Sequence, residues 1–256
     1  MHSGSADVPP SKVLPILEPL FERAKATDEF EYACTLLRIR GMEAEGWDPV
    51  TESQALISDA FTIIEKTKLE GAPLLRLGLL VYCHVTEMSM PYHVIANMLR
   101  VCKGQRYVMF PFESKPPARY PATKIKRIKD WAAELNLLEV SSLFDSFFSK
   151  EIRNAFFHSD YVIHGDRFNI TKGSGMLVDH VITPSVPINS HVLPKINDAV
   201  HFILDFFDLL ERCIRSYKEP KILQGRILAG DRYAEIELTV DPRFGLNGFR
   251  SPPRRS

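Results

Sequence analysis

The sequence lacks both an excess of charge of either sign and a long apolar run. Its 256 residues carry 32 lysines and arginines against 32 aspartates and glutamates, so the formal net charge is zero. A protein that coats nucleic acid through bulk charge is therefore disfavoured, and any polyanion site must be a local patch. The longest apolar run, residues 74–85, contains Arg76 and is shorter than the roughly 20 residues of a membrane span. We expect a chain without a membrane partner.

Cysteine is scarce, and no two cysteines are spaced as C-x-x-C. Each of the four lies in an apolar, helix-like stretch, which favours buried free thiols in a reducing cytosol over disulfides or zinc ligands. Residues 1–10 are polar, so we expect a flexible leader there, no signal peptide and a cytoplasmic location. The four cysteines are Cys34, Cys83, Cys102 and Cys213.

Several motifs of common enzyme classes are also missing. The chain has no glycine-rich phosphate loop, no H-E-x-x-H, no G-x-S-x-G and no convincing spacing of metal ligands. These absences disfavour a kinase, a dehydrogenase, a metalloprotease and a serine hydrolase. We expect no metal and no cofactor.

What is present is a globular composition with helical periodicity through most of the chain. Hydrophobic residues make up 45% and charged residues 25% of the sequence, both close to the globular average. Apolar side chains recur at helical spacing, and in residues 194–217 they alternate in steps of four and three, as at the seam of a helix bundle. The predicted helices span residues 11–25, 28–42, 51–69, 73–88, 91–104, 123–138, 141–158 and 194–217. The sequence therefore predicts a mainly α fold.

Two segments change to the alternating pattern of strands. Residues 161–170 read as a β-hairpin, with a third strand expected over 176–182. Residues 221–227 and 233–240 read as a second hairpin that turns at 229–231, followed by a polar tail. We therefore expect an N-terminal helical extension (1–70), a helical bundle (71–218) with an inserted β-hairpin (159–183), and a C-terminal β-hairpin and tail (219–256).

One short motif combines residues of chemical interest. Arg153 and Asn154 precede His158 at the end of the predicted helix 141–158. An R-x4-H spacing alone is expected about 0.6 times by chance in this composition, and the asparagine lowers that number to about 0.015. On a helical wheel Asn154 and His158 lie about 40° apart, at the edge of an apolar arc, whereas Arg153 lies about 140° from His158. Phe157 points away from this arc, so a partner subunit is expected to cover it. The arc consists of Leu143, Phe144, Phe147, Phe148, Ile152 and Ala155.

The motif R-N-x-x-x-H followed by S-D-Y, on a helix of an α-bundle, resembles the HEPN superfamily (higher eukaryotes and prokaryotes nucleotide-binding domains). The resemblance covers residues 71–218. It implies a HEPN-like helical bundle that forms a homodimer, in which two copies of Arg153, Asn154 and His158 face each other across a cleft. It also implies a metal-independent endoribonuclease that acts on RNA, in a toxin–antitoxin or antiviral defence setting, with an antitoxin or regulatory protein as a further partner.

The residue types suit this chemistry. RNA is cleaved by its own 2′-hydroxyl once a base removes the proton and cations hold the charge that grows on the phosphate. Histidine suits proton transfer near neutral pH, and arginine offers a planar, permanently charged fork to phosphate oxygens. Asn154 would orient the histidine or a phosphate oxygen. In a two-fold dimer, His158 of the second copy would supply the other acid–base group.

Weaker signals lie outside the motif. Six cations without an intervening acid form a candidate RNA-binding patch: Lys115, Arg119, Lys124, Lys126, Arg127 and Lys129. An ordinary solvated loop explains them equally well. His84 and Glu87, one turn apart on an apolar helix, together with Asp160 and Tyr161, are candidate cleft residues, although a core histidine is the simpler reading of His84.

Two further hypotheses remain open. The zero net charge and the extensions at both ends favour a non-catalytic HEPN-like module that binds a nucleotide or a partner protein. In a purely structural helical protein, Arg153 would be a solvated cation and His158 a partner of the helix dipole.

Overall fold

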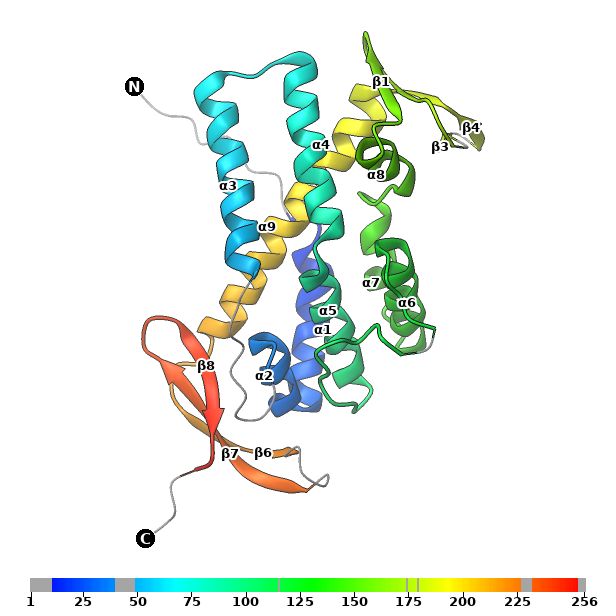
Figure 1. The fold of residues 1–256 in the computed structure, drawn as a ribbon. Coiled ribbons are helices and arrows are strands. Elements are labelled where there is room, and N and C mark those ends of the chain that lie inside the picture. Colours follow the sequence, from blue (N-terminus) through cyan, green and yellow to red (C-terminus); the bar gives the residue numbers. More distant parts are fainter. Residues whose placement is uncertain are drawn as a thin grey trace.

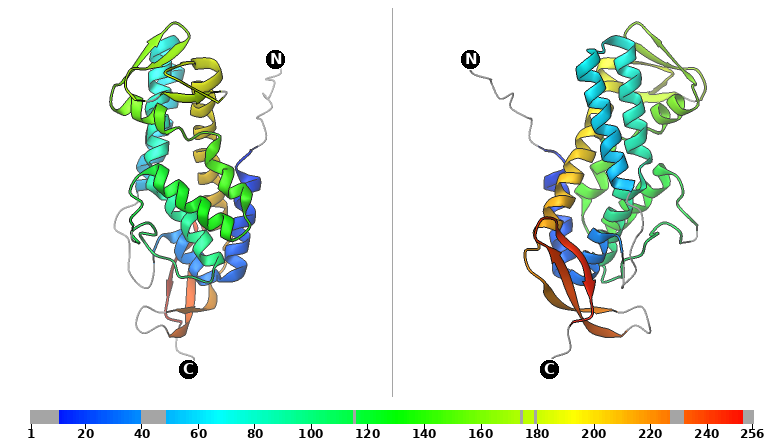
Figure 2. Two further views of the ribbon diagram at one scale, coloured as in Figure 1. Left: turned by 90° about the vertical axis from the view of Figure 1, so that its right-hand side faces the viewer. Right: turned by 60° about the vertical axis from the view of Figure 1, so that its left-hand side comes forward.

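The protein is mainly α and elongated, with small antiparallel sheets at opposite ends of a helical bundle (Figures 1 and 2). The computed structural model describes residues 11–39, 49–114, 116–173, 175–178, 180–226 and 232–252. None of the helices in these segments is long and apolar enough to span a lipid bilayer. The helices are α1 (Leu14–Thr27), α2 (Glu29–Leu37), α3 (Pro49–Thr67), α4 (Gly71–Glu87), α5 (Ser89–Cys102), α6 (Pro121–Glu134), α7 (Leu138–Ser142), α8 (Lys150–Phe157) and α9 (Leu193–Arg215).

In the part of the chain that the structure describes, the strands form three small antiparallel sheets. Strands β1, β2 and β5 make one sheet, β3 and β4 make a hairpin of their own, and β6, β7 and β8 make the third. The strands are β1 (Tyr161–His164), β2 (Arg167–Ile170), β3 (Met176–Val178), β4 (Val181–Thr183), β5 (Ser185–Pro187), β6 (Lys221–Arg226), β7 (Tyr233–Asp241) and β8 (Gly245–Arg250).

The first and last helices of the bundle share one hydrophobic core. Leu17 and Phe21 of α1 are buried, and the ring of Phe21 meets that of Phe206 of α9 edge to face at 6.5 Å. The Ser11 hydroxyl also donates to the Asp205 carboxylate of α9 at 2.6 Å. The segment predicted as an N-terminal extension therefore contributes to the same core as the bundle. The division of the chain into three domains stays a prediction.

Helix α2 begins where predicted but ends early. The Asp28 carboxylate accepts a hydrogen bond from the amide of Glu31 at 3.1 Å and so caps the helix, as the sequence indicated. The predicted end at residue 42 is wrong, because Arg38 adopts a left-handed backbone with φ of 57° and closes the helix after Leu37.

The continuous helix predicted over residues 141–158 is also wrong. It is divided into α7, a 3₁₀ turn η1 (Leu143–Asp145) and α8, because Ser149 is extended with φ of −131° and caps a new helix. Phe144 and Phe147 lie in the segment before α8 and pack on Phe202 of α9, with ring centroids 5.9 and 4.8 Å away. The single apolar arc from Leu143 to Ala155 therefore does not exist as one helix face.

The strand predictions need two corrections. The hairpin over 161–170 is confirmed with Tyr161 opposite Ile170, but its third strand is β5 and not residues 176–182, which fold into the separate hairpin β3–β4. The C-terminal hairpin is confirmed as β6–β7, and β8 adds a third strand that the sequence reading missed. The predicted turn at 229–231 and the leader at 1–10 lie outside the described residues.

All four cysteines are free. Cys34 and Cys83 are buried as expected, whereas Cys102 and Cys213 are only partly buried. Burial raises the pKa of the Cys83 thiol to about 12, and the nearby Arg153 offsets part of this rise. The thiol of Cys83 is therefore protonated at neutral pH and unsuited to act as a nucleophile.

Candidate functional site

The motif helix α8 is anchored at its first turn. The Ser149 hydroxyl accepts a hydrogen bond from the amide of Ile152 at 3.2 Å, which satisfies one of the free amides at the helix start. The buried hydroxyl of Tyr82 on α4 accepts from the Ser149 amide at 2.8 Å and donates to the Phe147 carbonyl at 3.1 Å. Because Ile152 and Ala155 are buried as well, the first turns of α8 are held at a defined position against α4.

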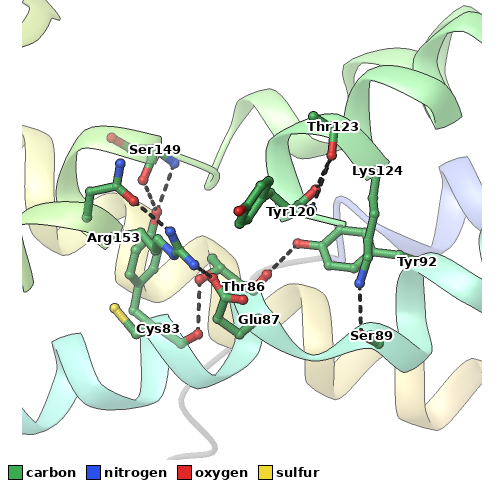
Figure 3. A network of polar contacts seen from close by, with 12 residues as sticks. Cys83, Thr86, Glu87, Ser89, Tyr92, Tyr120, Thr123, Lys124, Ser149 and Arg153 are labelled. Carbon is green, nitrogen blue, oxygen red and sulfur yellow. Dashed lines mark hydrogen bonds and ion pairs between the residues drawn. The ribbon is translucent and has the colours of Figure 1, made fainter. Parts of the chain in front are cut away.

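Arg153 points toward α4 and is engaged there. Its guanidinium forms an ion pair with Glu87 through Nη2 and donates from Nη1 to the Asn154 side-chain oxygen at 2.6 Å. It also lies over the ring of Phe157, 5.3 Å from the centroid. Figure 3 shows Arg153 and Glu87 facing each other between α8 and α4. Both terminal nitrogens of the arginine therefore have partners within the chain.

Asn154 and His158 open onto a different space, a pocket of about 550 Å³ beside α8. His158 ends α8, its amide donates to the Asn154 carbonyl at 3.0 Å, and its side chain is exposed. The pocket is bounded on one side by α8 and on the other by residues that follow β2. Its charged and polar side chains are Lys150, Glu151, Asn154, His158, Asp160 and Lys172.

The structure brings some of the predicted cleft residues together and separates others. Asp160 lines the pocket of Asn154 and His158. Tyr161 instead stacks on Phe168 with centroids 5.2 Å apart. His84 and Glu87 line another pocket, of about 320 Å³, at the junction of α4 and α5.

The environment of His84 does not favour a role in acid–base catalysis. Its Nε2 atom is buried and has no hydrogen-bond partner in the described part of the chain, and burial lowers the pKa of the imidazole. A neutral histidine at neutral pH follows from this environment. Glu87 is the member of the pair that reaches the motif, through Arg153.

The predicted cationic patch is largely engaged within the chain. Lys115 lies outside the described residues. Lys124 does not face solvent: only 8% of the residue is exposed, and its ammonium donates to the Ser89 hydroxyl at 2.8 Å and lies 5.8 Å from the Tyr92 ring centroid (Figure 3). Burial lowers the pKa of Lys124, and Glu87 opposes this effect.

Three of the other four cations of the patch have partners within the chain. Lys126 pairs with Asp130 at 2.8 Å, and Lys129 pairs with Asp145. Arg127 donates to the carbonyls of the loop before α6, including that of Pro116 at 2.5 Å. Arg119 is exposed. The stretch is free of acids in sequence, but the fold supplies acids from beyond it.

Two lysines that the sequence reading missed do line the motif pocket. Lys150 is the first residue of α8, and Lys172 follows β2. Lys150 precedes the motif by three residues, and this closeness in sequence could have identified it as a residue of the site. Lys172 was hidden because only the hairpin geometry places it beside α8.

Within the described segments, no group of three or more His, Cys, Asp or Glu side chains is arranged to hold a metal ion. Comparison of the chain with models of protein families, with curated proteins and with solved structures gives no match. The function of the site is therefore argued from its own residues and geometry.

Proposed function

We propose that this chain is a metal-independent endoribonuclease of the HEPN type that acts as a homodimer. The observation that carries the proposal is the shared pocket of Asn154 and His158. An exposed imidazole, a side-chain amide and two ammonium groups line the same open space as two carboxylates, and the first three kinds of group suit proton transfer and the binding of a phosphate during cleavage by a 2′-hydroxyl.

In the proposed reaction, His158 removes the proton of a ribose 2′-hydroxyl. The oxygen then attacks the adjacent phosphorus, the bond from phosphorus to the 5′-oxygen breaks, and a 2′,3′-cyclic phosphate forms. The leaving 5′-oxygen takes a proton from an acid, which in a dimer is His158 of the second copy. Asn154 donates a hydrogen bond to a phosphate oxygen as negative charge grows there.

Arg153 has a more restricted part in this proposal. Its Nη1 donates to the Asn154 oxygen, so it fixes the orientation of the amide that lines the pocket. Contact of its guanidinium with a phosphate requires the ion pair with Glu87 to open. We therefore assign Arg153 as a positioning residue in the unbound chain and as a phosphate ligand only after release from Glu87.

Exposed apolar side chains next to the motif support the homodimer. Phe157 directly precedes His158 and is 49% exposed, and Val162 of the neighbouring edge strand β1 is 50% exposed. Covering these exposed side chains with a second copy would remove apolar surface from water, which favours association. A toxin or defence setting, with an antitoxin or regulatory partner, rests on the resemblance of the motif alone.

The test is cleavage of single-stranded RNA in the presence of EDTA. We expect His158→Ala to lower the cleavage rate by about 10²- to 10⁴-fold, the usual contribution of an acid–base group. The matched control is His164→Ala, which alters another exposed histidine at the end of β1 and should leave the rate unchanged. Val162→Asp should reduce both the dimer fraction, measured by analytical ultracentrifugation, and the rate. Cleavage that survives His158→Ala would refute the proposal.

A second candidate function is a non-catalytic module that binds a nucleotide or a partner protein. The observation in its favour is that Glu87 and Asn154 already occupy both terminal nitrogens of Arg153. Wild-type protein that binds RNA and cleaves none of it, together with a Glu87→Gln variant that is equally inactive, would favour this module over the ribonuclease.

A further inference from the structure

We propose that the motif pocket holds one nucleotide of a single-stranded RNA, with Lys150 and Lys172 on a phosphate that flanks the cleaved one and Asp160 on a ribose hydroxyl. The inference rests on the proposed function, because it assigns the substrate contacts of the same site. It also moves RNA binding away from the cationic stretch before and within α6.

Lys150 and Lys172 are the ammonium groups available for a phosphate. They lie on the α8 side and the β2 side of the pocket, and both are exposed. In the described part of the chain, neither forms an ion pair or a hydrogen bond. A phosphate between them therefore displaces only water. By contrast, Lys126 and Lys129 would first have to leave Asp130 and Asp145.

The two carboxylates of the pocket differ in what they already bind. Glu151 accepts a hydrogen bond from the Ser149 hydroxyl at 3.2 Å. Asp160 is held through its backbone, since its amide donates to the Ala155 carbonyl at 2.8 Å and its carbonyl accepts from the Thr171 amide at 2.9 Å. Its carboxylate has no partner within the described residues. A carboxylate on a held backbone, with free acceptor sites, suits a ribose hydroxyl, as it does in dinucleotide-binding proteins.

The size and walls of the pocket favour a single unstacked nucleotide. A volume of about 550 Å³ lies within the range of small-ligand sites. The wall after β2 contains Gly173 and Gly175, whose backbones have φ of +111° and +83°. A Cβ at Gly173 would meet nothing within 4 Å, whereas a Cβ at Gly175 would lie 2.5 Å from the Thr183 carbonyl oxygen, so the wall is open at the first glycine and closed at the second. Proteins that act on RNA bind unstacked bases of single strands in such spaces.

The experiment measures binding without cleavage. The His158→Ala protein is titrated against a fluorescein-labelled single-stranded RNA of mixed sequence and against DNA of the same sequence, with anisotropy as the readout. Adding Lys172→Gln or Lys150→Gln should weaken RNA binding about tenfold and lower the salt dependence by about one phosphate contact. The matched control is Lys126→Gln, an exposed lysine paired with Asp130, which should leave both quantities unchanged.

A second arm tests the ribose contact. Adding Asp160→Asn to His158→Ala should lower the preference for RNA over DNA about tenfold, because a hydroxyl loses its charged acceptor. Circular dichroism confirms that each variant is folded.

The outcomes separate this inference from the proposed ribonuclease. If wild type cleaves RNA while Lys172→Gln, Lys150→Gln and Asp160→Asn bind RNA like their parent, the nucleotide subsite is wrong and the ribonuclease stands. If RNA binding depends on both lysines but wild type cleaves nothing, the subsite stands and the ribonuclease fails. If the parent protein does not bind RNA, the subsite is refuted.

Discussion

The sheet β6–β8 and the hairpin β3–β4 lie at opposite ends of the bundle and differ in what covers their apolar side chains (Figure 1). The C-terminal sheet packs on α2 and α9, where Leu238 is 0% exposed and the Phe249 ring meets that of Phe30 at 5.4 Å. In the hairpin, Leu177, Val181 and Ile182 are all more than half exposed.

This difference separates an end whose apolar side chains are covered within the chain from an end where they are exposed. Burying a leucine side chain contributes about 2 kcal/mol, so the C-terminal sheet adds to the stability of the helices that it covers. The hairpin gains little of that energy, and it lies at the same end as the motif helix α8 (Figures 1 and 2). Exposed apolar side chains beside an open polar pocket are expected where another molecule binds.

The largest effect on stability is expected from truncating a buried side chain of the sheet β6–β8. Leu238→Ala leaves a cavity in a site with no exposure, so the free energy of unfolding should fall by about 2 to 4 kcal/mol, measured by urea denaturation. The matched change in the hairpin β3–β4 is Leu177→Ala. It should alter the free energy of unfolding by less than about 0.5 kcal/mol, since Leu177 is 69% exposed. Equal losses from both variants would remove the distinction between the two ends.

A smaller loss of stability is expected at Gly225 of β6, where the strand backbone lies close to the side chains of Ile236 and Phe30. A Cβ at Gly225 of β6 would lie 2.5 Å from Cδ1 of Ile236 and 2.8 Å from Cγ of Phe30. Gly225→Ala should therefore cost about 1 to 3 kcal/mol in the same assay. Adding Ile236→Val removes Cδ1, the nearest of the clashing atoms, and should restore part of the loss. Unchanged stability in Gly225→Ala would show that the sheet does not press on α2.

The smallest effect concerns an enclosed histidine, in contrast to the exposed His158. Burial, and then the neighbouring Lys124, lower the pKa of His93 to about 4. The unfolded imidazole takes up a proton below about pH 6.5, whereas the folded one does not until about pH 4. Stability from this group is therefore present above pH 6.5 and is lost as the pH falls toward 4.

The measurement compares urea denaturation of wild type and His93→Leu at pH 7 and pH 5. Because His93 is partly exposed, we expect wild type to lose about 1 kcal/mol more than the variant between the two pH values. Exposed histidines contribute equally to both proteins, so the difference isolates His93. Parallel losses in the two proteins would contradict the assignment.

The sequence predicted the mainly α fold and most helices, because apolar periodicity and caps such as Asp28 are local signals. It did not predict the break before α8. That break depends on Ser149 being held by Tyr82, a residue 67 positions away, and on Phe144 and Phe147 packing against α9. Strand β8 was missed for a similar reason: its pairing with β7 is tertiary.

The candidate site was predictable only in part. The spacing of Asn154 and His158 on a helix correctly placed them on one side of α8. The same wheel separated Arg153 from His158, and Glu87 was expected as a cleft residue but not as the ion-pair partner of Arg153. Charge partners such as Asp145, which comes from a different element than Lys129, follow from the fold alone, so an acid-free run of cations is a weak guide to a free surface.

The contact between α1 and α9 also constrains how the chain folds as it is made. The Ser11–Asp205 hydrogen bond joins residues 194 positions apart, and Phe21 meets Phe206 beside it. A ribosome that adds roughly 5 to 20 residues per second takes about 10 to 40 s to reach α9 after α1 has emerged. During that interval α1 can pack on α2 and α5 but lacks α9, so the core that the two helices share closes only after most of the chain has been made.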